Sequence, residues 1–208
     1  MQRVRELLRD ILRQTDLVLL ALCCAATAYG ILMIYSATRY MNSMREVIVQ
    51  TGGAVIGIVL FFLLSMVDVG ELMRKKGWLW LTLLGLGLIL LLKSPFGVEG
   101  DTGNLAWLKF PLLPVMVQPS EIVKLTFILV LAWQLVWLEE NRTLRRLPDI
   151  LFLGVHLMVF FGLYYKISSD MGSDLVLVAI FVCMCFVAGV PKGWFIGGGV
   201  GAVLAFYI

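Results

Sequence analysis

The stretch QPSEIVK, residues 118–124, stands directly before an apolar run at residues 125–138. Proline suits the first position of a helix, because its missing N–H would have no partner there. The spacing therefore predicts a helix start with Gln118 near the N-cap and Glu121 at the third helical position. A carboxylate there can bond free backbone N–H groups, and Lys124 follows on the same helix face. The pattern fits either a capped helix with a local ion pair or a functional pair at a membrane surface.

Composition places this helix in a membrane protein. Of the 208 residues, 61% are hydrophobic and 15% are charged, whereas soluble domains have roughly 45–50% apolar and about 25% charged residues. The formal net charge is +3, but the lysines and arginines are spread among the polar segments. Such a spread forms no basic patch, so nucleic acid is not an expected partner. We expect an all-α fold, a polytopic helical bundle embedded in a membrane.

The apolar runs predict six full spans and a truncated seventh. They lie at about residues 17–37, 47–67, 78–92, 119–138, 149–165, 175–190 and 195–208. The last run has 14 residues, fewer than the roughly 20 that a helix needs to cross a bilayer. We therefore expect the chain to be the N-terminal part of a longer protein. Residues 1–15 alternate arginines and acids with leucines at helical spacing, which predicts an amphipathic surface segment.

The distribution of lysine and arginine predicts the orientation in the membrane. Alternate polar segments form two sets, one with 11 basic residues and the other with 5. The first set is 1–14, 68–77, 139–148 and 191–194, and the second is 38–46, 93–117 and 166–174. Basic segments stay in the cytoplasm. We therefore expect a cytoplasmic N-terminus, and an extracytoplasmic location for the 93–117 loop, the start of the fourth span and the loop that contains Asp170.

The 93–117 loop is the longest, and it is rich in aromatic and leucine residues. A loop this apolar is expected to pack back on the membrane face or to dip into it. Long ordered loops are also more often functional than short ones.

Three candidate features meet on the predicted outer side. Glu121 with Lys124 is the first, and Asp170 with Asp174 is the second, because residues four apart share a face if the sixth helix begins early. Gly172 between the aspartates suggests a tight turn. Lys109 in the long loop is the third. Each also has a purely structural interpretation, as a helix cap or a solvated lysine. Together, lysines that bind phosphate and carboxylates that act as bases or metal ligands suit an amphipathic substrate with an anionic head.

Histidine and cysteine give no sign of a metal site. The four cysteines lie in apolar runs without a CxxC spacing, and the single histidine, His156, lies in the middle of another apolar run. We expect His156 to be a packed core residue, with a proton relay as the alternative. The cofactor stays unknown at this stage, with a divalent cation among the options.

Five motifs, in order along the chain, give the sequence a family resemblance. They are GILMIYSA at 30–37, GNLAWL at 103–108, QPSEIVK at 118–124, SSDMGS at 168–173 and FVAG at 186–189. Together they resemble the SEDS family, the shape, elongation, division and sporulation proteins of bacteria. The match has departures. Ala106 stands where the family usually has arginine, and Ser168 and Ser169 replace glutamine and proline.

The resemblance implies a fold of about ten spans and a peptidoglycan glycosyltransferase. Such a protein polymerises the lipid-linked disaccharide pentapeptide at the outer face of the bacterial cytoplasmic membrane, in elongation, division or sporulation. A class B penicillin-binding protein would be its partner. The resemblance also marks Gln118, Pro119, Ser120 and Gly172 as motif residues, and it places the family's catalytic aspartate beyond Ile208. The catalytic residue of this chain is therefore unknown.

Two other classes of function stay open on the sequence. One is a flippase or transporter of the lipid-linked precursor, and the other is a non-catalytic membrane scaffold for cell-wall enzymes. A transporter is expected to carry charged residues deep in several spans. Here the span centres are nearly free of charge, which disfavours that class. A scaffold needs no carboxylate and lysine pair, so substitution of Glu121 and Lys124 separates it from an enzyme.

Overall fold

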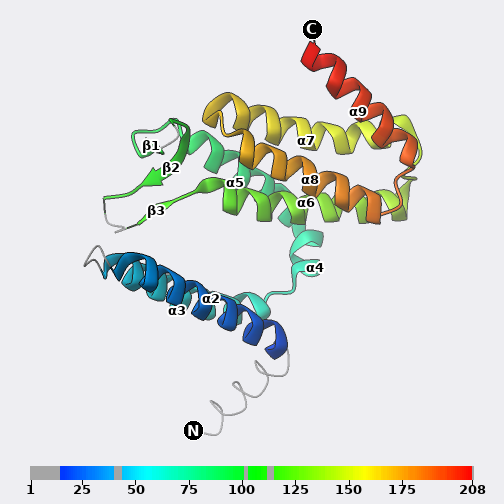
Figure 1. Cartoon of the computed structure of the whole chain (residues 1–208). Helices are drawn as coiled ribbons and strands as arrows, with labels where there is room; N and C mark the ends of the chain where they lie inside the picture. Colours follow the sequence, from blue (N-terminus) through cyan, green and yellow to red (C-terminus); the bar gives the residue numbers. More distant parts are fainter. Residues whose placement is uncertain (1–14, 40–43, 101–102, 112–114, 208) are drawn as a thin grey trace, which may run out of the picture. The chain divides into compact units, whose positions relative to one another are not determined.

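A computed structural model describes residues 15–39, 44–100, 103–111 and 115–207 (Figure 1). Nearly all of the predicted amphipathic segment 1–15 lies outside these ranges. The chain forms two compact units, residues 1–72 and residues 73–208. Each unit is described by itself.

The first unit is a pair of long apolar helices, α2 (Leu17–Thr38) and α3 (Arg45–Ser65), followed by the short α4 (Val69–Leu72). Asp16 caps α2, because its Oδ1 accepts hydrogen bonds from the backbone N–H groups of Val18 and Leu19, both at 3.0 Å. No described residue of α2 or α3 is buried. Exposed apolar surface is unfavourable in water by about 25 cal/mol per Å2, so these two helices suit a lipid environment.

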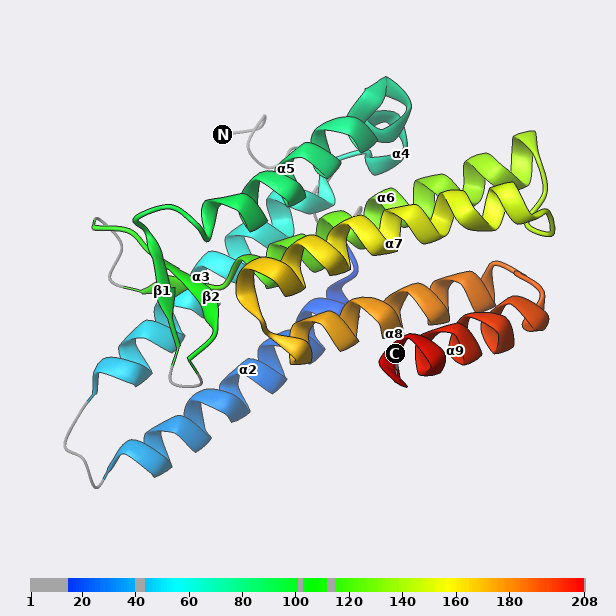
Figure 2. The same ribbon diagram turned by 90° about the horizontal axis from the view of Figure 1, so that it is seen from above.

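In the described part of the second unit, five longer helices follow a short, kinked π-helical segment, η2 (Met73–Gly77). They are α5 (Trp78–Leu91), α6 (Pro119–Asn141), α7 (Leu147–Ser168), α8 (Met171–Val187) and α9 (Lys192–Tyr207). Helix α6 packs against α5, α7 and α8, and Figure 2 shows it running alongside α7. Ten residues of α6 are buried, among them Phe127 and Leu131. This helix is therefore the centre of the hydrophobic core.

A glycine allows α5 to approach α6 and α7 closely. A Cβ atom on Gly85 would lie 2.7 Å from Thr126 Oγ1 and 2.8 Å from Phe160 Cε1. At the start of α5, the rings of Trp78 and Trp133 stack with centroids 4.7 Å apart. Small residues at such a crossing let membrane helices pack by van der Waals contact.

The 93–117 loop forms a small antiparallel sheet, which adds a β element to the expected helical bundle. Its strands are β1 (Gly97–Glu99), β2 (Leu105–Lys109) and β3 (Met116–Val117), with β2 in the middle. Side chains alternate along a strand, and in β2 the residues Ala106 and Leu108 are buried. Leu108 belongs to the same core cluster as Phe127 of α6. The apolar loop therefore packs onto the helices at their end.

Within the described ranges, four helices are long and apolar enough to cross a membrane, namely α2, α3, α6 and α7, and α8 is a shorter apolar helix. Many large apolar side chains on them are exposed. The expected polytopic helical bundle in a membrane is thereby confirmed.

Candidate functional site

One end of the second unit brings together three of the five sequence motifs, those at 103–108, 118–124 and 168–173. Helix α6 begins there, α7 ends there and α8 begins there, beside the three-stranded sheet (Figures 1 and 2). Strand β2 packs against both α6 and α7 at this end. Residues that are far apart in sequence therefore line a single face of the unit.

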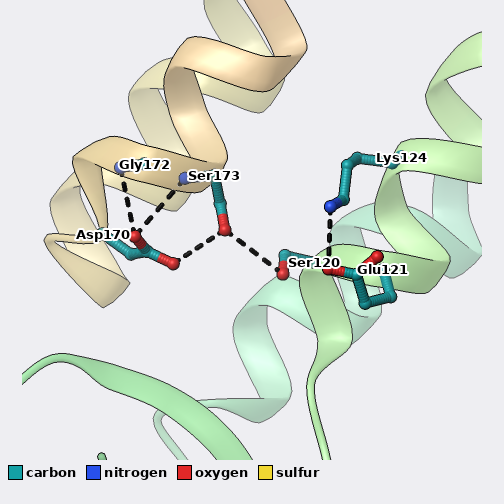
Figure 3. A network of polar contacts seen from close by, with 6 residues as sticks. All are labelled: Ser120, Glu121, Lys124, Asp170, Gly172 and Ser173. Atoms are coloured by element: carbon teal, nitrogen blue, oxygen red, sulfur yellow. Dashed lines mark hydrogen bonds and ion pairs between the residues drawn. The ribbon is translucent and has the colours of Figure 1, made fainter. Parts of the chain in front are cut away.

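Glu121 and Lys124 form an ion pair in the first turns of α6. The Lys124 Nζ atom donates to Glu121 Oε1 at 2.7 Å (Figure 3). Pro119 is at the start of the helix and Gln118 is the N-cap residue, but the Gln118 side chain makes no capping hydrogen bond. The Glu121 carboxylate therefore bonds the lysine rather than capping the helix. The Glu121 side chain is 63% exposed and that of Lys124 is 19% exposed, so the ammonium group lies closer to the protein.

Asp170 is the N-cap residue of α8. Its Oδ1 accepts hydrogen bonds from the backbone N–H of Gly172 at 3.1 Å and of Ser173 at 3.3 Å. The Ser173 hydroxyl donates to Oδ2 at 2.7 Å. The expected tight turn at Gly172 is wrong, because Gly172 lies inside the first turn of α8. The sharp change of direction occurs at Ser169, whose φ of 57° is left-handed.

Ser173 links the two motifs. Its Oγ lies 3.4 Å from Ser120 Oγ, and the two hydroxyls are hydrogen-bonded (Figure 3). Ser120 is 3% exposed and Ser173 is 9% exposed. Ser173 was not among the residues predicted for the site. Its position three residues after an aspartate N-cap was the available signal, because a side chain there can reach back to the cap.

Asp174 lies one helical turn after Asp170, as expected for a helix that begins early. It is only 1% exposed, and neither of its carboxylate oxygens has a hydrogen-bond partner among the described residues. The buried Ser168 hydroxyl at the end of α7 also lacks a partner in the described part of the chain. A carboxylate in this position favours a nearby donor or cation.

Lys109 is the last residue of β2, and its side chain is exposed. Its backbone N–H donates to the Phe96 carbonyl at 2.9 Å, which fixes the end of the strand. The sheet places Lys109 at the same end of the unit as the other candidates.

His156 lies away from this end, in the middle of α7. Its ring centroid is 4.6 Å from that of Phe127 and 5.0 Å from that of Phe160. The imidazole is therefore packed between two aromatic rings. Within the described ranges, no group of three or more potential metal-ligating His, Cys, Asp or Glu residues comes together.

The Glu121 and Lys124 pair is suited to binding a phosphate group. A lysine ammonium ion binds phosphate as a point charge, and a paired carboxylate fixes where that charge lies. The Asp170 carboxylate accepts three hydrogen bonds as the N-cap of α8, and these bonds fix the first turn of that helix. The serine contact then fixes the start of α6 relative to the start of α8.

The fold and this charged end define a polytopic helical membrane protein with an interfacial polar site. The family model FTSW_RODA_SPOVE, described as "Cell cycle protein", matches residues 16–208. The chain belongs to the SEDS family, and the resemblance found in the sequence is confirmed.

Curated relatives carry related names. The chain is 32% identical over 210 residues to "Probable peptidoglycan glycosyltransferase FtsW" of Trichlorobacter lovleyi, covering 95% of the chain and 52% of that protein. It is 33% identical over 181 residues to "Peptidoglycan glycosyltransferase RodA" of Treponema pallidum, covering 85% of the chain and 39% of that protein. The chain therefore spans about half or less of the length of these two relatives.

Solved structures agree with the fold. One is described as "Structural coordination of polymerization and crosslinking by a peptidoglycan synthase complex". Its matching chain has a TM-score of 0.75 and 28% identity, over 92% of this chain and 53% of that one. The rod shape determining protein RodA of Thermus thermophilus has a TM-score of 0.68 and 27% identity, over 91% of this chain and 59% of its own.

Proposed function

We propose that this chain is part of a peptidoglycan glycosyltransferase. Its substrate is the lipid-linked disaccharide pentapeptide, polymerised at the outer face of the bacterial cytoplasmic membrane. The ion pair between Glu121 and Lys124 at the start of α6 carries the proposal, because it presents a positioned ammonium group at the end of a membrane helix. The printed names of the relatives support the reaction type.

Lys124 holds the substrate's pyrophosphate, and Glu121 orients the lysine. A lone lysine side chain samples many rotamers, and an ion pair at 2.7 Å restricts them before the substrate arrives. Prior restriction reduces the ordering entropy that binding must overcome. Lys109, exposed at the end of β2, is a second contact for phosphate at the same end of the unit.

The Asp170 and Glu121 carboxylates position other groups of the site. Asp170 accepts three hydrogen bonds as the N-cap of α8, so it fixes the start of that helix. Glu121 is paired with Lys124 and orients the ammonium group. We therefore give both carboxylates a positioning role and leave the catalytic residue unassigned.

The orientation and the partner follow from the same proposal. The asymmetry of 11 basic residues against 5 favours a cytoplasmic N-terminus and an outward site. A class B penicillin-binding protein would cross-link the strands that the polymerase makes. One structural neighbour comes from a complex described as coordinating polymerization and crosslinking, which supports this pairing.

Polymerisation by the full-length protein, reconstituted with the lipid-linked precursor, tests the proposal. Lys124→Met should lower the rate at least about tenfold, equivalent to about 1.4 kcal/mol of lost transition-state stabilisation. Lys192→Met is the matched control, since Lys192 is an exposed lysine at the start of α9. Equal rates for the two variants, at equal protein level, would favour a scaffold and contradict the proposal.

A further inference from the structure

The turn between α6 and α7 contains a pocket that the proposed function does not use. Figure 2 shows this turn at the end of the helices opposite to the three-stranded sheet. The pocket has a volume of about 360 Å3, within the usual range for small-ligand sites. Its lining residues are Asn141, Arg142, Thr143, Arg146, Pro148 and Asp149. We refer to it as the α6–α7 pocket.

A buried carboxylate holds one arginine in this pocket. Asp149, in the first turn of α7, is 1% exposed, and its Oδ1 accepts a hydrogen bond from Arg142 Nη1 at 3.4 Å. Its Oδ2 is buried and has no hydrogen-bond partner in the described ranges. A buried charge with so few partners strongly favours a positive group beside it. Asp149 therefore keeps the Arg142 guanidinium at the pocket.

An aromatic ring fixes the same guanidinium from another direction. The Cζ atom of Arg142 lies 5.3 Å from the centroid of the Trp137 ring, a distance at which a cation and an aromatic face attract each other. The Arg142 side chain is still 54% exposed. Its remaining N–H groups are thus available to a ligand from outside.

The charge balance of the pocket favours an anion. Arg142 and Arg146 supply two guanidinium groups against the one carboxylate of Asp149, which leaves one positive charge in excess. Arg146 is exposed and stands at the N-cap of α7. Planar guanidinium groups bind phosphate through paired N–H donors. A phosphate group with a single negative charge matches this pocket in charge and in geometry.

The position of the pocket identifies the source of the phosphate. Helices α6 and α7 are each long and apolar enough to cross a membrane, so the turn between them lies at the membrane surface. In the first turns of α7, which carry Pro148 and Asp149 of the pocket, the apolar side chains of Leu147 and Leu151 are more than half exposed. Acyl chains can lie along such residues while their headgroup stays at the turn. Basic pockets between membrane helices are known to accept anionic lipid headgroups.

We propose that the α6–α7 pocket binds the phosphodiester headgroup of an anionic membrane phospholipid. Arg142 and Arg146 bond the phosphate, and Asp149 is a positioning residue that acts through Arg142. The site is separate from the Glu121 and Lys124 site, and it does not depend on the proposed polymerase activity. A lipid bound here would also hold the turn between α6 and α7 at the depth of the lipid headgroups.

Fluorescence quenching by brominated lipid tests this proposal, because Trp137 lies beside the pocket. The purified full-length protein keeps Trp137 as its single tryptophan, with phenylalanine at the other tryptophan positions, and is placed in phosphatidylcholine nanodiscs. Brominated phosphatidylglycerol should quench Trp137 at a mole fraction at least about fivefold lower than brominated phosphatidylcholine requires. Arg146→Gln and Asp149→Asn should each remove most of this preference.

Arg145→Gln is the matched control, since Arg145 is exposed in the same turn but does not line the pocket. It should keep the preference. Equal quenching by the two lipids, or an equal loss in the Arg145 and Arg146 variants, would overturn the proposal. A third arm adds inorganic phosphate at constant ionic strength. Release of the brominated lipid by millimolar phosphate would assign the pocket to a soluble phosphate compound and would equally overturn a lipid site.

Discussion

The hydroxyl groups of Ser120 and Ser173 are hydrogen-bonded with their oxygens 3.4 Å apart, although the residues are 53 positions apart in sequence. Both side chains are buried. Ser173 also donates to the Asp170 carboxylate. The N-cap of α8 is therefore connected through two serines to the turn of α6 that carries Glu121 and Lys124. This contact joins the start of α6 to the start of α8.

The serine contact should appear as an interaction energy. Ser173→Ala removes both hydrogen bonds of the hydroxyl and should lower the free energy of unfolding by about 1 kcal/mol, whereas Ser120→Ala should have a smaller effect. The double variant should be less destabilised than the sum of the two, by about 0.5 kcal/mol. Thermal unfolding of the four proteins in one detergent measures this cycle. Strict additivity would show that the two hydroxyls do not interact.

Gly85 should tolerate no side chain. A Cβ atom there would lie 2.7 Å from Thr126 Oγ1 and 2.8 Å from Phe160 Cε1, so Gly85→Ala must push α5 away from α6 and α7. We expect a loss of about 1–3 kcal/mol, as for other overpacked cores. Gly87→Ala is the control, because nothing lies within 4 Å of a Cβ at that position. It should leave the unfolding temperature unchanged or slightly raised. Equal effects of the two substitutions would contradict the packing of α5.

The helices and the start of α6 could be predicted from the sequence. Apolar runs of bilayer length have few alternatives to a helix, because in lipid every backbone polar group must be paired within the structure. Proline and the polar residues around it predicted where α6 begins, and the helix does begin at Pro119. These are local signals, which one segment carries by itself.

The sheet and the serine contact could not be predicted in the same way. Strand β2 has only five residues, and its pairing with Gly97–Glu99 and Met116–Val117 depends on loop geometry. The contact of Ser173 with Ser120 depends on how α6 and α8 pack. Neither arrangement leaves a periodic pattern in the sequence. Asp170 was correctly placed near a helix start, but its use as a cap depends on the left-handed turn at Ser169.

Replacement of Asp174 should stabilise the protein. Its carboxylate is buried, and the described residues supply no hydrogen-bond partner to either oxygen. Asp174→Asn keeps the shape and removes the charge, which should raise the free energy of unfolding by about 1 kcal/mol or more at neutral pH. Asp170→Ala, one turn earlier, should do the opposite, because it removes an N-cap worth about 1 kcal/mol. Thermal unfolding at pH 7 compares the two.

A loss of stability in Asp174→Asn would reverse this interpretation. It would show that a donor or cation outside the described residues pairs with the carboxylate in the complete protein. A gain in the free energy of unfolding would thus mean that the Asp174 carboxylate is unpaired, and a loss would mean that it has a partner.

The orientation of the chain predicts which polar segments are accessible from outside the cell. In a protein with its four cysteines replaced by serine, a cysteine at Glu99 should react with a membrane-impermeant maleimide, because β1 lies in the outward loop of the proposed topology. A cysteine at Glu140, at the end of α6, should react only after the membrane is permeabilised. Both glutamates are exposed, so burial does not distinguish them. The reverse labelling pattern would contradict a cytoplasmic N-terminus.

Glu121 and Lys124 should behave as one unit in the full-length protein. If they served only as a surface ion pair, Glu121→Gln would change stability by at most about 1 kcal/mol and leave polymerisation unchanged. If Glu121 orients Lys124 toward a pyrophosphate, Glu121→Gln and Lys124→Met should each lower the polymerisation rate at least about tenfold. The double variant should then be no slower than the slower single variant, because each substitution alone already removes the positioned charge.

Glu139→Gln, an exposed glutamate at the opposite end of α6, is the control for charge and should retain full activity. Independent, multiplicative losses in the double variant would mean that the two side chains act separately, and unchanged activity in a stable Glu121→Gln protein would reduce the ion pair to a structural role at the start of α6.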